Sequence, residues 1–151
     1  MKLINRASYM DTLTSLIGVP DIKVITGIRR SGKSKLLESL RDFIEASLPN
    51  SNVIHINYNL NEFEGLLEYH ELLTYVKEHR REGAQNFLLI DEVQMCNGFE
   101  RAVNGFHASE TMGARSTATL MSMPASVACP VPIPIARRSS ATSIFLQFLR
   151  R

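Results

Sequence analysis

The sequence predicts an α/β fold in which helices cover both faces of a mostly parallel β-sheet, giving three layers. Short β-branched apolar segments alternate with segments whose apolar residues recur at helical spacing. A glycine-containing loop at 27–34 joins the first such strand directly to a helix. A second apolar run, 87–90, ends in an acidic pair, which is typical of a buried parallel strand. Strands that alternate with helices form right-handed crossovers, so the sheet is expected to be mostly parallel.

Seven elements are predicted in the first 110 residues, and each rests on periodicity together with the turn residues that flank it. In chain order they are a helix at 7–17, a strand at 21–26, a helix from the loop to about Pro49, a strand at 53–58, a helix at 66–80 that ends before Gly83, a strand at 87–91 and a helix at 99–108.

The loop at 27–34 fits the G-x-x-x-x-G-K-[ST] pattern between a strand and a helix. Its glycines let the backbone curl around a polyphosphate, and the start of the helix adds positive dipole. Lys33 is expected to reach the β- and γ-phosphates, and the Ser34 hydroxyl is expected to coordinate Mg²⁺. The predicted nucleotide-binding residues are Gly27, Ile28, Arg29, Arg30, Ser31, Gly32, Lys33 and Ser34.

The acidic pair Asp91-Glu92 ends the third predicted strand. A carboxylate at that position can hold Mg²⁺ through its waters, and we assign this role to Asp91. Glu92 is expected to orient or deprotonate the water that attacks the γ-phosphate, so Glu92 and Lys33 are the predicted catalytic residues. The pair favours an ATPase over a GTPase switch, since no Asn-Lys-x-Asp motif occurs in the chain. Gln94 either couples the nucleotide state to the following segment or begins the next helix, and we favour the second.

These motifs resemble those of the prokaryotic AAA-domain ATPases that carry an uncharacterised C-terminal domain. The similar segments are 22–34, His55-Ile56-Asn57-Tyr58 and 89–94, and the resemblance covers roughly residues 1–110. It implies a P-loop NTPase fold that binds ATP with Mg²⁺, of the class that has an extra strand and a catalytic glutamate.

The resemblance also implies a strand after the acidic pair, inserted between the first and third strands and carrying a polar sensor of the γ-phosphate. The candidate for this strand is 117–123, with Thr119 or Ser122 as the sensor. Residues 142–149 suit a short isolated helix. The fold is therefore expected to be incomplete at its C-terminal end, with no arginine finger located.

The composition changes after Glu110. The first 110 residues hold all 15 acidic side chains and 12 of the 17 Lys and Arg, whereas residues 111–151 hold five arginines and no acid. Four prolines between 124 and 134 preclude a helix or a central strand there. We divide the chain into an ATPase-like part, 1–110, and a low-order Ser/Ala/Pro/Arg-rich tail, 111–151. A truncated or frame-shifted gene would explain this change.

The bulk properties suggest a cytoplasmic protein. No signal core is present, and no stretch approaches the roughly 20 apolar residues that span a bilayer. Cys96 and Cys129 are expected to be free thiols, and the histidines lack zinc-ligand spacing. The scattered arginines of the tail do not support nucleic-acid binding.

The sequence thus favours an ATP-binding protein that hydrolyses ATP to ADP and phosphate if its site is complete. The alternative is a non-catalytic nucleotide-binding fragment that acts at most as an interaction module. ATP is the expected partner, no protein partner can be named, and a homo-oligomer stays open.

Overall fold

The computed structural model describes residues 6–19, 22–28, 30–110, 119–122 and 142–148. The strands are β1 (Lys23–Thr26), β2 (Ser51–Asn57), β3 (Gln85–Asp91), β4 (Thr119–Ser122) and β5 (Thr142–Phe148). The helices are α1 (Arg6–Ser15), α2 (Lys33–Ser47), α3 (Tyr69–His79) and α4 (Phe99–Glu110), with 3₁₀ turns η1 (Asn61–Leu66) and η2 (Val93–Met95). Within these residues the strands form one sheet in the order β2-β3-β5-β1-β4.

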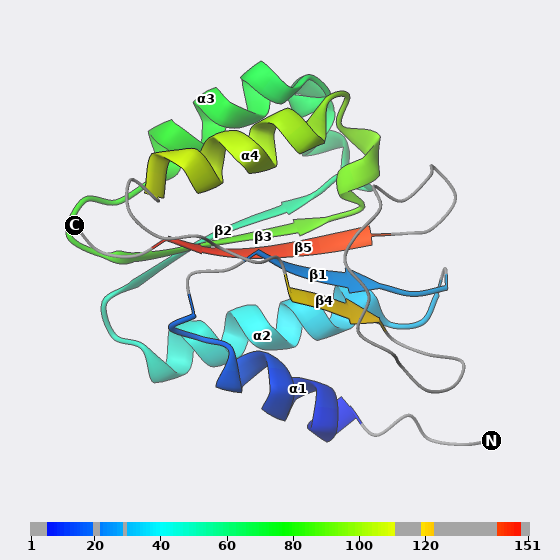
Figure 1. Ribbon diagram of the computed structural model, residues 1–151, viewed down its shortest axis with the longest axis vertical. Helices are drawn as coiled ribbons and strands as arrows, with labels where there is room; N and C mark the ends of the chain where they lie inside the picture. Colours follow the sequence, from blue (N-terminus) through cyan, green and yellow to red (C-terminus); the bar gives the residue numbers. More distant parts are fainter. Residues whose placement is uncertain (1–5, 20–21, 29, 111–118, 123–141, 149–151) are drawn as a thin grey trace.

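The three-layer α/β/α architecture predicted from the sequence is confirmed. Figure 1 shows α3 and α4 on one face of the sheet and α1 and α2 on the other. Strands β2 and β3 pair in parallel, as do β1 and β4, whereas β5 is antiparallel to both of its neighbours. Four of the five strands therefore point in the same direction, and the sheet departs from the predicted parallel arrangement only at β5.

The core has two parts because successive side chains of a strand point to opposite faces. Along β3, Phe87 and Leu89 face α1 and α2, whereas Leu88 and Ile90 face α3 and α4. All four are fully buried. The side of α2 that meets the sheet is equally apolar, with Leu36, Leu37, Leu40 and Ile44 buried. The continuous apolar run in β3 thus reflects a central strand that is covered on both faces.

The helix predicted at 66–80 is shorter than expected. The segment 61–66 forms η1, so α3 begins at Tyr69, and it ends at His79. Gly83 does not end the helix as predicted, because Arg80 is already extended. Gly83 instead has a φ of 73° in the turn that leads into β3. That turn is held by the side chain of Asn86, which bonds both backbone groups of Arg81.

The strand between β1 and β3 is not the one that we predicted. Segment 119–122 forms β4, which pairs with β1 on the opposite side from β3. The predicted insertion of this strand is therefore wrong, and Thr119 and Ser122 do not lie between β1 and β3. The rest of the predicted strand, 117–118 and 123, lies outside the described residues.

The central position is filled by β5, which was predicted as a helix. This prediction is wrong because β5 completes two ladders, pairing Ile90 and Val24 with Ile144. The segment is rich in β-branched and aromatic residues, and the open position between two strands offers backbone partners that an isolated helix would lack. The remainder of 111–151 lies outside the described residues, and the boundary at residue 110 stays a prediction.

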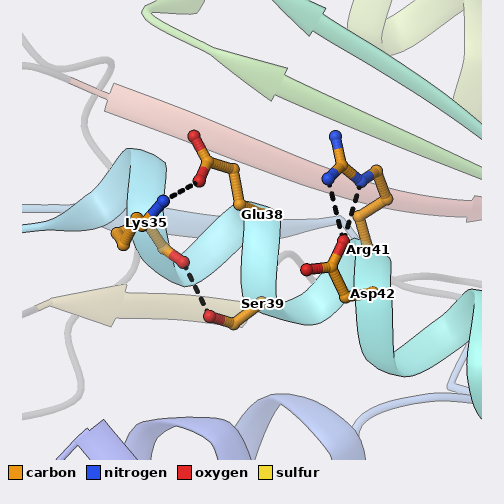
Figure 2. A network of polar contacts seen from close by, with 5 residues as sticks. All are labelled: Lys35, Glu38, Ser39, Arg41 and Asp42. Carbon is orange, nitrogen blue, oxygen red and sulfur yellow. Dashed lines mark hydrogen bonds and ion pairs between the residues drawn. The ribbon is translucent and has the colours of Figure 1, made fainter.

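Charged side chains of α2 form two ion pairs (Figure 2). Lys35 contacts Glu38 at 2.6 Å, and Arg41 contacts Asp42 at 2.8 Å. The Ser39 hydroxyl donates to the Lys35 carbonyl oxygen at 2.9 Å. Because solvent screens exposed pairs of this kind, they contribute little to stability. We therefore interpret them as a solvated helix face.

Among the helices that the structure describes, none combines the length and the apolar character that crossing a membrane requires.

Candidate functional site

The loop at 27–34 runs from the end of β1 to the start of α2, as the sequence predicts. Arg30 and Gly32 both have positive φ, 65° and 90°. The Ser31 N–H donates to the Ile28 carbonyl oxygen at 3.1 Å, which closes a tight turn between them. A backbone that alternates into the left-handed region can form a concave anion-binding nest. Arg29 lies outside the described residues.

The ammonium of Lys33 lies inside this loop. Its Nζ donates to the carbonyl oxygens of Gly27 and Ile28, each at 3.2 Å, and to the Ser31 hydroxyl at 3.5 Å. Only 4% of Lys33 is exposed. A buried cation held by neutral oxygens is incompletely neutralised, so the loop has a net attraction for an anion.

The first turn of α2 provides further positive potential. Gly32 is its N-cap and supplies no side-chain hydrogen bond, and no acidic residue lies in the first turn. The first N–H groups of a helix have no partner within the helix, so they are available to an anion. Ser34 is the second residue of α2 and is half-buried, which puts its hydroxyl within this turn.

The acidic pair follows the end of β3. Asp91 is the last residue of the strand and is 1% exposed. It lies on the α2 face, because it follows Phe87 and Leu89 at intervals of two. Its Oδ1 accepts the Glu92 N–H at 3.1 Å. The carboxylate and the start of α2 therefore occupy the same face and the same edge of the sheet.

Glu92 has an unusual backbone. Its φ and ψ are 57° and 41°, in the left-handed region that few residues other than glycine adopt. Its side chain is half-buried, and Oε2 accepts a hydrogen bond from the amide of Gln94. Gln94 is part of η2, so it does not begin a regular α-helix as we favoured. The contact with Glu92 was not predicted, because the sequence pattern does not determine where side chains point in the loop that follows a strand.

Asn57 is a second residue that sequence reasoning missed. It ends β2 and pairs in register with Asp91 on β3. The Tyr58 N–H donates to the Asp91 carbonyl oxygen at 3.3 Å, which fixes the two strand ends against each other. The signal was available in the sequence, since the carboxyl ends of neighbouring parallel strands meet at one edge.

Cys96 closes the turn after Glu92 and is a poor nucleophile. Burial has the largest effect and raises the pKa of its thiol, and the negative charges of nearby glutamates raise that pKa further. The thiol is therefore protonated at neutral pH and inert. Cys129 lies outside the described residues.

The predicted γ-phosphate sensors, Thr119 and Ser122, do not lie beside the acidic pair. Ser122 pairs with Thr26 at the end of β1, but β1 and β5 separate its strand from β3. Strand β5 runs in the opposite direction, so its carboxyl end lies at the other edge of the sheet. Neither β4 nor β5 therefore places a residue from its own carboxyl end beside Asp91.

The fold and the glycine-containing loop define an α/β protein of the P-loop NTPase type. A family model described as AAA domain matches residues 19–122. The chain therefore belongs to the AAA domain family, which confirms the resemblance seen in its motifs. This membership indicates an ATP-binding AAA-type protein, and such proteins generally use Mg²⁺ with ATP.

A relative from Haemophilus influenzae (strain ATCC 51907 / DSM 11121 / KW20 / Rd), described as an uncharacterized protein, is 29% identical over 109 residues. The match covers 71% of this chain and 27% of the relative, so the chain spans about a quarter of that protein's length. No solved structure matches the chain.

Proposed function

We propose that the chain binds Mg-ATP at the loop 27–34 and hydrolyses it to ADP and phosphate. The observation that carries this proposal is the buried ammonium of Lys33, which donates to Gly27 and Ile28 inside the loop. Phosphate oxygens are better acceptors for an ammonium than neutral carbonyls, because the bond is charge-assisted at both ends. Family membership supports the same nucleotide.

The residues present fit a magnesium ion. Mg²⁺ prefers oxygen ligands and keeps several waters, so one buried carboxylate and one hydroxyl are sufficient protein ligands. Asp91 is a buried carboxylate at the strand end, and Ser34 is in the first turn of the neighbouring helix. The chemistry that Mg²⁺ supplies when it is bound is neutralisation of charge on the phosphate oxygens.

In the proposed reaction the protein positions the groups and stabilises charge. Lys33 and the N–H groups of the loop hold the phosphates and stabilise the negative charge on the transferring phosphoryl group. Glu92 accepts a hydrogen bond from the attacking water and takes its proton as the new P–O bond forms. ADP leaves with the electron pair of the broken P–O bond.

The variants Lys33→Ala and Glu92→Gln test the proposal. We expect Lys33→Ala to abolish the rise in melting temperature that Mg-ATP produces in the wild type. Ligand at 100 times its Kd adds about 2.7 kcal/mol to the free energy of unfolding, which is readily detected. We expect Glu92→Gln to keep that rise and to lose about 10²–10⁴-fold in phosphate release.

Lys35→Ala is the matched control, because Lys35 is a solvent-exposed lysine on the same helix, two residues further on. It should retain both binding and turnover. A melting temperature that Mg-ATP raises equally in wild type and Lys33→Ala would overturn the proposed site.

A second candidate function is nucleotide binding without turnover. The antiparallel direction of β5 favours it, since the central strand cannot bring a sensor residue to the site from its carboxyl end. Phosphate release by the wild type that equals that of Glu92→Gln, together with a retained Mg-ATP shift, would establish this alternative.

A further inference from the structure

The side chain of Glu92 is held by Gln94, a residue two positions further along the chain. The amide Nε2 of Gln94 donates to Oε2 of Glu92. No corresponding contact to Oε1 occurs within the part of the chain that the structure describes. One oxygen of the carboxylate is therefore held by the protein, and the other accepts no hydrogen bond from the described residues.

The turn that carries Gln94 is firmly anchored. Val93, its first residue, and Cys96, which follows it, are 0% and 2% exposed, so both are embedded in the core. The Met95 N–H donates to the Glu92 carbonyl oxygen at 2.9 Å, and the Cys96 N–H donates to that of Val93 at 3.0 Å. The amide of Gln94 therefore extends from a turn that backbone hydrogen bonds close and that two buried side chains hold in the core.

Both ends of this segment are tied to other elements. The Asp91 carbonyl oxygen accepts the Tyr58 N–H at 3.3 Å. At the far end, the Asn97 N–H donates to the Leu67 carbonyl oxygen at 2.6 Å, and the Asn97 carbonyl oxygen accepts the Tyr69 N–H at 3.1 Å. These bonds hold the segment 91–97 against the end of β2 and the start of α3, so rotation of Glu92 has to occur in its side chain.

We propose that Gln94 is a positioning residue that fixes the carboxylate of Glu92 for activation of water. This inference rests on the proposed hydrolysis of ATP. A glutamate side chain has three rotatable bonds, and an unrestrained carboxylate would leave the attacking geometry for most of the time. The hydrogen bond from Gln94 removes that freedom before nucleotide arrives, which is the preorganisation that precise catalysis requires.

Gln94→Met tests the role, because methionine keeps the length of the side chain and cannot donate. We expect phosphate release to fall on the order of 100-fold, while the Kd for Mg-ATP stays within about twofold. Gln94→Lys restores a donor of similar reach and should recover a substantial part of the turnover. Met95→Ala changes an exposed side chain of the same turn and should leave both quantities unchanged.

The two proposals fail in different ways. If the wild type turns over ATP and Gln94→Met differs from it by less than about threefold, the positioning role is overturned while the hydrolysis proposal stands. If the wild type itself releases phosphate no faster than Glu92→Gln, the hydrolysis proposal fails, and the positioning role is overturned with it.

A measurement without nucleotide tests the contact directly. The melting temperatures of Glu92→Met, Gln94→Met and the double variant form a cycle with the wild type, because methionine at 92 removes the acceptor and methionine at 94 removes the donor. If Gln94 donates to Glu92, the two single effects are not additive, and we expect a discrepancy of about 2–4 °C. Additive effects would show that the hydrogen bond is absent in solution, which would overturn the inference whatever the turnover.

Discussion

Arg30 and Gly32, two residues apart in the loop between β1 and α2, both have positive φ, 65° and 90°. A residue with a side chain at such a position is strained by about 1–2 kcal/mol, whereas glycine is not. The backbone is therefore strained at Arg30 and unstrained at Gly32.

We expect Gly32→Ala to lower the free energy of unfolding by about 1–2 kcal/mol and to remove the rise in melting temperature with Mg-ATP. Gly65→Ala is the control, because a Cβ there meets no atom within 4 Å and the residue has no positive φ. Urea unfolding of both variants provides the comparison. Equal stability of the two variants would contradict the left-handed conformation at Gly32.

The places of the loop and of the acidic pair in the fold could be predicted, because each is a short continuous stretch of sequence. The loop and the acidic pair each follow a buried strand, so their common edge follows from the rule that parallel strands end together. The side-chain contact between Gln94 and Glu92 could not be predicted, because it depends on the left-handed backbone of Glu92. Asn57 was recognisable by its place at a strand end and was overlooked.

The errors of prediction fall where pairing across the sheet decides the structure. The segment 142–148 has apolar residues that suit either a helix or a strand, and only the gap between β1 and β3 selects the strand. Local periodicity contains no information about such a gap. The same limit explains why 119–122 was assigned to the centre of the sheet although it lies beside β1 on the other side.

The central position of β5 predicts a large effect of proline there. Ile144 pairs with Val24 on β1 and with Ile90 on β3. Its N–H therefore points toward a paired strand on either side, and proline would remove this donor. We expect Ile144→Pro to cost about 3 kcal/mol or more in the free energy of unfolding. Leu120→Pro in β4 should cost less, because the described ladder of β4 is with β1 alone. Urea denaturation followed by circular dichroism distinguishes the two, and a wild-type midpoint for Ile144→Pro would refute the placement of β5.

Asn86 predicts a stability effect that no apolar pattern reveals. Its side chain is 3% exposed, yet the amide oxygen accepts from Arg81 N–H and Asn52 Nδ2 at 2.9 and 2.8 Å. Its Nδ2 donates to the carbonyl oxygens of Arg81 and Ala84, each at 3.0 Å. Every polar group of the amide is therefore satisfied in the turn before β3.

We expect Asn86→Ala to lower the free energy of unfolding by about 2–3 kcal/mol, since it removes hydrogen bonds to both backbone groups of Arg81 and to the buried carbonyl oxygen of Ala84. Asn86→Asp should be at least as unstable at neutral pH, because a carboxylate would face two carbonyl oxygens. Asn104→Ala, at an exposed position of α4, serves as the control and should change stability by no more than about 0.5 kcal/mol. Thermal melts at neutral pH measure all three.

His55 predicts how stability depends on pH. The imidazole is half-buried on β2, and burial, followed by the positive charge of Arg41, lowers its pKa. Asp91, Glu38 and Asp42 act in the opposite direction, but their effects are smaller than that of burial. The ordinary pKa of histidine, about 6.5, applies in the unfolded chain. The unfolded state therefore binds a proton more readily than the folded state does.

Stability that depends on neutral His55 is present above pH of about 6.5 and is lost as the pH falls through the lower pKa of the folded protein. We expect the urea midpoint to fall on acidification from neutral pH, and His55→Gln to fall less steeply because glutamine does not titrate. His70→Gln, which replaces an exposed histidine of α3, should keep the wild-type slope. If His55→Gln and the wild type lose stability in parallel over this range, the acid sensitivity comes from other groups and the half-buried imidazole is not its source.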